Sequence, residues 1–415
     1  TLKINLPADI PTGQSWQRLA LASGPSNPVR VVASSLPTAV EGGAGNNDVK
    51  SAQAVAVPST ISGRIESESD IDCYVFEAKK GEKYTFEVVA RRAGSALDPH
   101  LRILDATGKQ LSLNDDFRRL KRLTQDSQVE NFTVPADGKY VIEIRDVHLR
   151  GGPRHVYAVR TTKAVPYFEL FLDSDKTQLT PATHGVIFVR SERHNGFAGA
   201  IDLAVDHLPP GVIARCGRIL ANGTDGCIIL SANADAKPAI SNISVTGTEI
   251  QTAKSPPGPP LTDIARPMQE TYMPGGGRNH WPVNTHAVNV GERSDIRSIQ
   301  LSTLAVTLKP GGSTTIKVNF ERAPGFTKNV TLDVLFQHLG TVYGNSLPKG
   351  VTIDAGASKT LITGKASQGQ IVLKAAKDAP PVTMQQISVM ANVSINFVMK
   401  ATYSSPPLMV TVTKP

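Results

Sequence analysis

The sequence is poor in cysteine, in aromatic residues and in long apolar runs. Three cysteines in 415 residues are too few for a disulfide scaffold. No apolar run approaches the roughly 18 to 20 residues that a membrane-spanning helix needs. The first residues, TLKINLPADIPTG, lack the basic and apolar regions of a signal peptide. We therefore expect a soluble chain without a transmembrane segment, from which any export signal has already been removed.

Motifs that identify common enzymes are also missing. The chain has no HExxH zinc helix, GxSxG nucleophile elbow, CxxC pair, CxxCH haem site or GxxxxGK phosphate loop. Two carboxylates can hydrolyse a glycoside wherever the fold brings them together, but nothing singles out a pair among the 36 acidic residues. We predict no catalytic residue and no enzyme activity in this chain; the alternative is a catalytic region upstream of residue 1.

The net charge of +8 comes from basic side chains spread along the chain, with one cluster, RRLKR, at 118–122. Positive charge attracts nucleic acids and acidic polysaccharides alike. Aromatic residues make up only 5% of the chain, and stacking platforms or a helix for the major groove are what nucleic-acid binding normally requires. We exclude nucleic acid as a partner and leave open whether the cluster attracts acidic polysaccharide or is a solvated loop.

The positions of the three cysteines lead to two predictions about their thiols. Cys216 and Cys227 flank GRILANGTDG, whose Asn-Gly and Asp-Gly pairs indicate a hairpin. Such a hairpin could bring the two sulfurs together, so either a disulfide or two free thiols fits the pattern. Cys73 lies among residues at strand spacing, which favours a buried thiol over a nucleophile.

What the sequence does contain is alternation of apolar and polar residues with a period of two. Turn formers such as DATGK, PADGK and KKGEK separate these stretches at the 8 to 12 residue spacing of antiparallel sandwiches. No segment of a dozen residues has a helical period with caps. We therefore predict an all-β chain of tandem β-sandwiches. The alternating stretches are 83–90, 100–106, 139–147, 155–161, 200–206, 314–320, 329–335 and 386–395.

A long internal repeat suggests the division into domains. GFAGAIDLAVDHLPPGV (196–212) matches 325–351, if the second copy carries an insertion, and both end in a Leu-Pro-x-Gly-Val turn. Pro and Gly dominate the segment between the copies, which favours extended backbone with little regular structure, docked through Tyr272 and Trp281. We predict a strand segment at 1–41 that ends a preceding β domain or stands alone, a sandwich at 42–165, an Ig-like sandwich at 166–254, a connector at 255–299 and a second Ig-like sandwich at 300–415.

Residues 41–163 resemble the bacterial pre-peptidase C-terminal domain. The similarity rests on Glu41 with GNND, then SDIDCYVFEAKKGEKYTFEV, GSALDPHLRILDATGKQLSLNDD, VPADGKYVIEIRD and HVYAVRT, in the order and spacing of that family. The resemblance implies a compact jelly-roll-like sandwich that accompanies secreted peptidases and large cell-surface proteins. The rest of the chain resembles the Ig-like domains of long exported proteins of planctomycete-type bacteria.

The same resemblance implies a metal site. Collagen-binding relatives hold calcium with an Asn- and Glu-rich lead-in and paired aspartates, and Ca²⁺ prefers such oxygen ligands. The matching positions are Glu41, Asn47, Asp48, Asp70 and Asp72, although the lead-in EGGAGNND lacks a second glutamate and contains added glycines. The alternative is that these aspartates cap turns or accept hydrogen bonds from backbone amides. Calcium is the only cofactor that the resemblance suggests.

The predicted function follows from the predicted domains. We expect a non-catalytic exported protein that acts as a structural, docking or adhesion module, either alone or as a subunit of a larger cell-envelope assembly, with other envelope or extracellular proteins as partners. It would be secreted, periplasmic or exposed at the cell surface. The alternative is a calcium-assisted module of a secreted hydrolase that binds carbohydrate or matrix protein.

Overall fold

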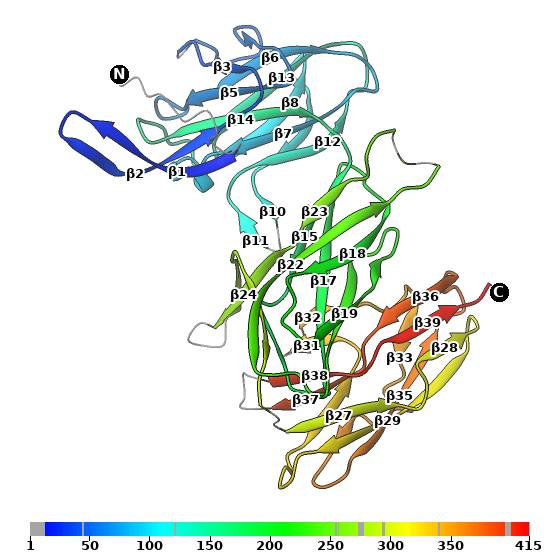
Figure 1. Cartoon of the computed structure of the whole chain (residues 1–415). Helices are drawn as coiled ribbons and strands as arrows, with labels where there is room; N and C mark the ends of the chain where they lie inside the picture. Colours follow the sequence, from blue (N-terminus) through cyan, green and yellow to red (C-terminus); the bar gives the residue numbers. More distant parts are fainter. Residues whose placement is uncertain are drawn as a thin grey trace. The chain divides into compact units, whose positions relative to one another are not determined.

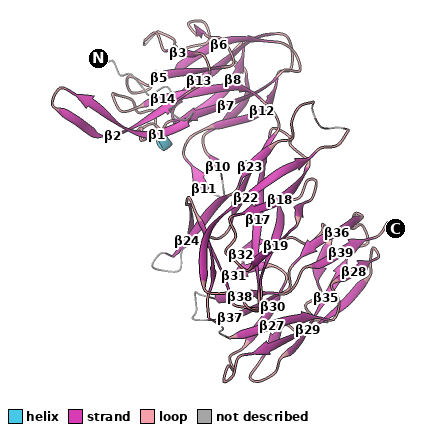
Figure 2. Ribbon diagram, viewed as in Figure 1, coloured by secondary structure: helices cyan, strands magenta, loops and turns pink. Residues whose placement is uncertain are grey.

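The chain is built almost entirely of β-strands. The computed structural model describes residues 13–43, 45–119, 122–253, 255, 257–272, 278–292, 295–338, 341–394 and 400–414. Within these ranges the single helical element is the 3₁₀ turn η1 (Arg91–Ala93), so no described helix is long and apolar enough to span a membrane (Figure 2). The chain forms two compact units: unit 1 is Thr1–Pro166 with His194–Gly196, and unit 2 is Tyr167–Arg193 with Phe197–Pro415. The all-β prediction is confirmed.

Unit 1 is a sandwich of two five-stranded sheets (Figure 1). The first sheet has the order β12-β7-β14-β5-β3 and the second the order β4-β6-β13-β8-β9. Their strands are β3 (Thr38–Val40), β4 (Gln53–Ala54), β5 (Ser59–Arg64), β6 (Asp72–Ala78), β7 (Lys83–Val89), β8 (Pro99–Asp105), β9 (Gln110–Asn114), β12 (Gln128–Thr133), β13 (Gly138–Asp146) and β14 (Val156–Lys163).

Alternation along the strands builds the core between the two sheets. Tyr74 and Phe76 of β6 are 0% and 2% exposed, so both lie in this core. The Phe76 ring centroid lies 5.9 Å from that of Tyr84 and 5.6 Å from that of Phe86, which β7 brings from the facing sheet. Aromatic pairs at such distances add to the stability gained from their burial. Because side chains two apart in a strand share a face, Asp72 points into this core as well.

Two hairpins accompany the sandwich of unit 1. They are β1 (Gly13–Leu21) with β2 (Gly24–Ala33), and β10 (Phe117–Arg119) with β11 (Arg122–Thr124), and each forms a two-stranded sheet of its own. The segment that follows β2 belongs to the sandwich, since β3 pairs with β5 in parallel. The strand segment predicted at 1–41 therefore contains a hairpin and the edge strand of the first sheet.

Unit 2 contains two hydrophobic cores. One gathers buried side chains between residues 168 and 290, and the other gathers them between residues 296 and 412. A sheet with the order β25-β24-β15-β17-β38-β37-β30-β34 contains strands that contribute to each core. The strands of the first half are β15 (Tyr167–Leu172), β16 (Lys176–Leu179), β17 (His184–His194), β18 (Ala200–Asp206), β19 (Val212–Cys216), β20 (Arg218–Ile219), β21 (Asp225–Ala232), β22 (Ala239–Ile250), β23 (Thr262–Ile264), β24 (Arg266–Tyr272), β25 (Arg278–Pro282) and β26 (His286–Val290).

The second half of unit 2 has the same all-β character. Its strands are β27 (Ile296–Leu301), β28 (Ala305–Leu308), β29 (Ser313–Arg322), β30 (Val330–Asp333), β31 (Phe336–His338), β32 (Thr341–Gly344), β33 (Val351–Ile353), β34 (Leu361–Ile362), β35 (Gln368–Ala375), β36 (Val382–Ile387), β37 (Met390–Ser394), β38 (Lys400–Ser404) and β39 (Leu408–Val412).

The two Leu-Pro-x-Gly-Val turns of the repeat have the same local structure. Gly211 and Gly350 have φ angles of 76° and 78°, a region that favours glycine. A side chain at either position would also press on an alanine, Ala236 in the first copy and Ala379 in the second. Each turn is followed directly by a strand, β19 or β33. The repeat in the sequence therefore corresponds to a repeated turn in the structure.

The prediction of little regular structure in 255–299 is wrong for the described residues of that segment. Strands β23 to β26 lie there, with the beginning of β27 at its end. β26 pairs in parallel with β16 and antiparallel with β22, which makes it part of a sheet of the first sandwich. Met268 is 1% exposed and Trp281 is 45% exposed, whereas the side chain of Tyr272 lies outside the described residues.

Two glutamines of β36 join the two sandwiches of unit 2. The side-chain amide of Gln386 donates to the carbonyls of Arg215 (2.9 Å) and Cys227 (3.1 Å) in the preceding sandwich. That of Gln385 donates to the Arg218 carbonyl at 3.2 Å. Both glutamines are almost fully buried. Beside them the rings of Phe188 and Phe336 stack with centroids 5.8 Å apart, so the junction is both polar and apolar.

The cysteines are unpaired. β19 and β21 do form neighbouring strands, but the register places Cys216 opposite Ile228. Cys227 is one residue away and therefore points to the other face of the sheet, which prevents a disulfide with Cys216. Cys216 is exposed, whereas Cys73 and Cys227 are buried, as predicted for Cys73.

We expect one of the three thiols to react with Ellman's reagent in the native protein and all three to react after unfolding in denaturant. Burial raises the pKa of Cys73 to about 12 and that of Cys227 to about 11, so neither forms the reactive thiolate at neutral pH. Cys216→Ser should abolish the native reaction. A reductant-dependent increase in the thiol count would contradict the unpaired state.

Candidate metal centre

The first residue of β6 places a carboxylate inside unit 1. Asp72 is fully buried and its Oδ2 accepts a hydrogen bond of 2.6 Å from the Tyr157 hydroxyl. That hydroxyl in turn lies 2.6 Å from the hydroxyl of Tyr74. Gly63 on β5 makes room for both rings, since a Cβ atom there would lie 2.7 Å from the Tyr74 hydroxyl and closer still to that of Tyr157. The polar groups thus form a short buried chain between the two sheets.

Two glutamates approach Asp72 from other segments. Glu41 follows β3, where its backbone N–H donates to the Ser62 carbonyl and its Oε2 accepts the N–H of Arg64 at 2.8 Å. Glu66 lies in the loop between β5 and β6, with its Oε1 3.5 Å from Arg64 Nη2. The three carboxylates therefore come from the lead-in, from the loop and from β6, which belongs to the other sheet.

The free oxygens of these carboxylates converge. Glu41, Glu66 and Asp72 each offer one oxygen, and the three oxygens lie within 4.8 Å of one another. Glu41 Oε1, Glu66 Oε2 and Asp72 Oδ1 are buried without a hydrogen-bond partner among the described residues. Buried acceptors are rarely left unsatisfied. A hard divalent cation such as Ca²⁺ takes carboxylate oxygens of this kind, so the donor set fits it.

Burial and the closeness of the three carboxylates also set the pKa values of the cluster. Burial raises the pKa of Asp72 to about 9, and the neighbouring Glu41 carboxyl adds to the rise, whereas the hydrogen bond from Tyr157 opposes it. Burial also raises the pKa of Glu66, helped by Asp70. Like charges in a poorly solvated place favour protonation unless a cation neutralises them. The cluster can therefore exist in a protonated form or in a form that holds a metal ion.

Of the five residues predicted as metal ligands, the structure brings Glu41 and Asp72 together. Asp70 is buried nearby, but its carboxylate caps the loop by accepting the N–H groups of Glu66 (2.7 Å) and Ile71 (3.0 Å). This is the turn-capping role that the sequence left open. The remaining two residues, Asn47 and Asp48, are exposed.

The exposed end of the lead-in forms a turn of its own. Asp48 Oδ1 accepts the N–H groups of Lys50 and Ser51, both at 2.8 Å. These bonds, led by that of Ser51, lower the pKa of Asp48. The residue that reaches the sandwich is Asn46, which is 4% exposed and whose carbonyl accepts the N–H of Cys73 at 2.8 Å. The lead-in therefore contacts β6 through Asn46, the residue directly before the predicted Asn47 and Asp48.

Sequence reasoning missed Glu66. It stands in RIESESD, where three acidic residues alternate with serines and isoleucine, and no periodicity separates Glu66 from Glu68. The distinguishing feature is the loop that Asp70 caps, because its bond to the Glu66 N–H fixes the backbone from which Glu66 projects. A capping aspartate four residues downstream is a signal that could have been used.

No protein-family model matches the chain. A probable subtilase-type serine protease of Deinococcus radiodurans is 38% identical over 81 residues. The match covers 19% of this chain and 10% of that protein, so the chain spans a small part of the relative's length.

Two solved structures give the scale of the structural similarity. Domains 4–9 of the surface layer protein SbsC align with 84% of this chain and 48% of their own, at 12% identity and a TM-score of 0.23. The D0–D1 domain of intimin aligns with 59% of this chain and 99% of its own, at 12% identity and a TM-score of 0.20. TM-scores this low carry no argument about arrangement or function.

Proposed function

We propose that the chain is a non-catalytic, exported β-sandwich protein that serves as a structural, docking or adhesion module, and that calcium fixes the lead-in of its pre-peptidase-like unit 1. The observation that carries the proposal is the set of three buried carboxylate oxygens, on Glu41, Glu66 and Asp72, that converge without partners among the described residues. Glu41, Glu66 and Asp72 would hold the ion.

The position of the cluster supports a structural role for the ion. Its ligands come from the end of β3, from the β5–β6 loop and from β6, so one ion would link segments of both sheets. Binding to the folded state alone stabilises that state. Extracellular calcium concentrations suit sites of low affinity, which extracellular modules commonly have. Calcium would thus stiffen unit 1 outside the cell.

The docking part of the proposal is supported by the succession of sandwiches. Each sandwich has its own hydrophobic core, and each presents sheet edges and loops to which partners can bind. The pre-peptidase-like motifs and the similarity to 10% of a probable subtilase-type protease fit a module that accompanies other domains.

Calorimetric titration of the intact, chelator-treated chain with Ca²⁺ tests the proposal. We expect binding by unit 1 that Glu66→Gln weakens by at least about tenfold, because affinity follows the number of ligand charges. Glu68→Gln is the matched control: it removes the same charge from the same loop at an exposed position and should leave the affinity unchanged. Absence of binding heat, or equal losses in the two variants, would refute the metal centre.

A further inference from the structure

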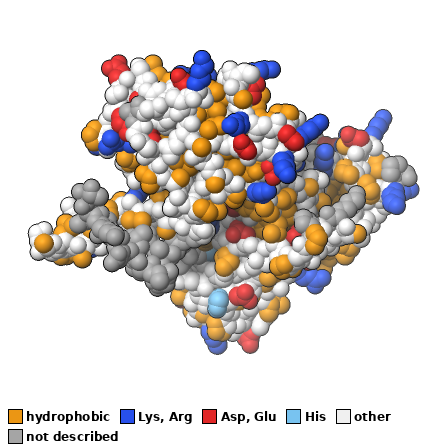
Figure 3. All heavy atoms as spheres, turned by 90° about the horizontal axis from the view of Figure 1, so that it is seen from above, with side chains coloured by type: hydrophobic (Ala, Val, Ile, Leu, Met, Phe, Trp, Pro, Cys, Tyr) orange, Lys and Arg blue, Asp and Glu red, His pale blue; other side chains and the backbone are white. Residues whose placement is uncertain are grey.

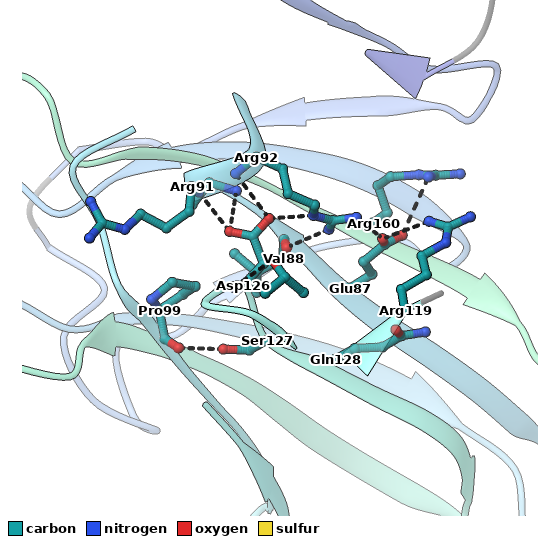
Figure 4. A network of polar contacts seen from close by, with 12 residues as sticks. Glu87, Val88, Arg91, Arg92, Pro99, Arg119, Asp126, Ser127, Gln128 and Arg160 are labelled. Atoms are coloured by element: carbon teal, nitrogen blue, oxygen red, sulfur yellow. Dashed lines mark hydrogen bonds and ion pairs between the residues drawn. The ribbon is translucent and has the colours of Figure 1, made fainter. Parts of the chain in front are cut away.

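Several arginines of unit 1 gather around one carboxylate. On the face shown in Figure 3, Lys and Arg side chains alternate with acidic ones, and no continuous basic field is visible. A different arrangement occurs on the outer face of the first sheet, where Glu87 of β7 is the ion-pair partner of three arginines (Figure 4). Their guanidinium nitrogens lie 2.9 Å (Arg92), 3.3 Å (Arg160) and 4.0 Å (Arg119) from its carboxylate.

The fold holds these arginines in place from three directions. Arg160 of β14 is the direct cross-strand neighbour of Glu87. Arg92 belongs to η1 and also donates from Nη2 to the Val88 carbonyl at 3.1 Å. Arg119 comes from the hairpin β10–β11, whose Phe117 ring lies under the Arg92 guanidinium at 5.1 Å. Guanidinium groups held in this way are ready for a planar anion without further ordering.

Two carboxylates of the described residues, Glu87 and Asp126, pair with the three guanidinium groups. Asp126, the other acid of the network, accepts the backbone N–H groups of Ala90 and Arg91 as well as the Nε–H of Arg92, so its oxygens are occupied. The side chains of Arg119 and Arg160 remain 37% and 32% exposed. Parts of these two guanidinium-bearing side chains are therefore accessible to an anion from solvent.

An exposed aromatic ring is linked to this cluster. Trp16 of β1 is 62% exposed, and the guanidinium of its cross-strand neighbour Arg30 lies 4.7 Å from the ring centroid. Arg30 also donates from Nη1 to the Arg92 carbonyl. The hairpin β1–β2 thus connects an aromatic platform with the arginines around Glu87.

We propose that Trp16, Arg30, Arg92, Arg119 and Arg160 form a binding surface for an acidic polysaccharide. Fixed guanidinium groups bind sulfate and carboxylate groups in a bidentate manner, and the amphipathic face of an exposed tryptophan suits a sugar ring. A protein partner is disfavoured, because protein interfaces need a desolvated apolar centre, whereas the described side chains of this surface are mainly charged and surround two rings, Trp16 and Phe117.

This surface deepens the proposed adhesion role by giving it a ligand class, but it does not depend on calcium. None of its five residues belongs to the carboxylate cluster formed by Glu41, Glu66 and Asp72. Glu66→Gln should therefore leave polysaccharide binding intact, and the two proposals can fail independently.

The test uses the intact chain on immobilised heparin, polygalacturonate and neutral dextran at low ionic strength. We expect binding to one or both acidic polymers and none to dextran, with affinity falling as salt rises because screening weakens exposed charges. Heparin and polygalacturonate distinguish sulfate from carboxylate recognition. Equal binding to dextran would overturn the proposal, as would absence of binding to both acidic polymers.

Single substitutions locate the surface. Arg160→Gln and Trp16→Ala should each weaken binding by about three- to tenfold, which corresponds to the loss of one exposed charged or aromatic contact. Glu87→Gln should strengthen binding, since it removes the internal competitor for the arginines. Lys139→Gln is the charge control, because Lys139 lies on the other sheet and its side chain is 63% exposed.

Thermal melting of each variant separates lost binding from lost folding. Folded Arg160→Gln and Trp16→Ala proteins with unchanged affinity would overturn the proposal. So would a loss in Lys139→Gln as large as that in Arg160→Gln, because binding would then follow net charge alone.

Discussion

Gly63→Ala is expected to lower the free energy of unfolding of unit 1 by about 2 to 3 kcal/mol, the cost of overpacking a filled core. A Cβ atom at residue 63 would lie 2.6 Å from Cζ of Tyr157 and 2.7 Å from the Tyr74 hydroxyl. Neither ring can withdraw, because both are buried and their hydroxyls hold each other and Asp72. Differential scanning calorimetry should show the unit 1 transition roughly 5 to 10 °C lower.

Gly45→Ala is the control for this substitution. Gly45 lies in the lead-in of the same unit, nothing approaches its hypothetical Cβ atom within 4 Å, and it is exposed. Its replacement should change the free energy of unfolding by no more than about 0.5 kcal/mol. If Gly63→Ala were equally harmless, the tyrosines would not be packed against β5 as described.

Asp72→Asn is expected to stabilise unit 1 strongly in chelator and much less in calcium. In chelator, ionisation of Asp72 is unfavourable in the folded state, because burial raises its pKa from 3.8 to about 9. A raised pKa means that the folded state binds the proton more tightly than the unfolded state, so stability is highest below pH 4 and falls as the pH rises toward about 9. At pH 7 the cost is on the order of 4 kcal/mol, which asparagine avoids.

With saturating calcium the stability advantage of Asp72→Asn over the wild type should become much smaller. The ion neutralises the carboxylates and stabilises the wild type by about 2.7 kcal/mol at a hundredfold excess over Kd, whereas Asp72→Asn lacks one ligand charge. Melting curves of both proteins from pH 5 to 9, with calcium and with chelator, measure how far calcium reduces the difference. Identical pH profiles for the two proteins in chelator would show that Asp72 is not the group that resists ionisation.

The fold of unit 1 could be predicted because its signals are local. Alternation in 83–90 and 139–147 predicted strands that the structure forms as β7 and β13. The strands of 255–299 were missed for the opposite reason. β26 pairs with β22 and with β16, and β16 lies more than a hundred residues earlier in the chain. Pro and Gly in the sequence describe local backbone preference and carry no information about such distant partners.

The metal centre was predicted in part for similar physical reasons. Asp72 was among the residues that the pre-peptidase resemblance implies, and its burial follows from its place in β6, two residues before the buried Tyr74. Asn47 and Asp48 were expected to take part, but the turn from Asp48 to Ser51 directs them toward solvent. Glu66 depends on a loop conformation that is fixed by hydrogen bonds rather than by any repeating pattern. Side chains on strands are therefore easier to place from sequence than side chains on loops.

The junction between the sandwiches of unit 2 resists bending. Bending at this junction would separate Gln385 and Gln386 from the carbonyls of Arg218, Arg215 and Cys227. Each buried polar group left without a partner costs about 1 to 3 kcal/mol, so thermal motion rarely opens the joint. A force that pulls the two sandwiches apart must therefore break these hydrogen bonds before the sandwiches can separate.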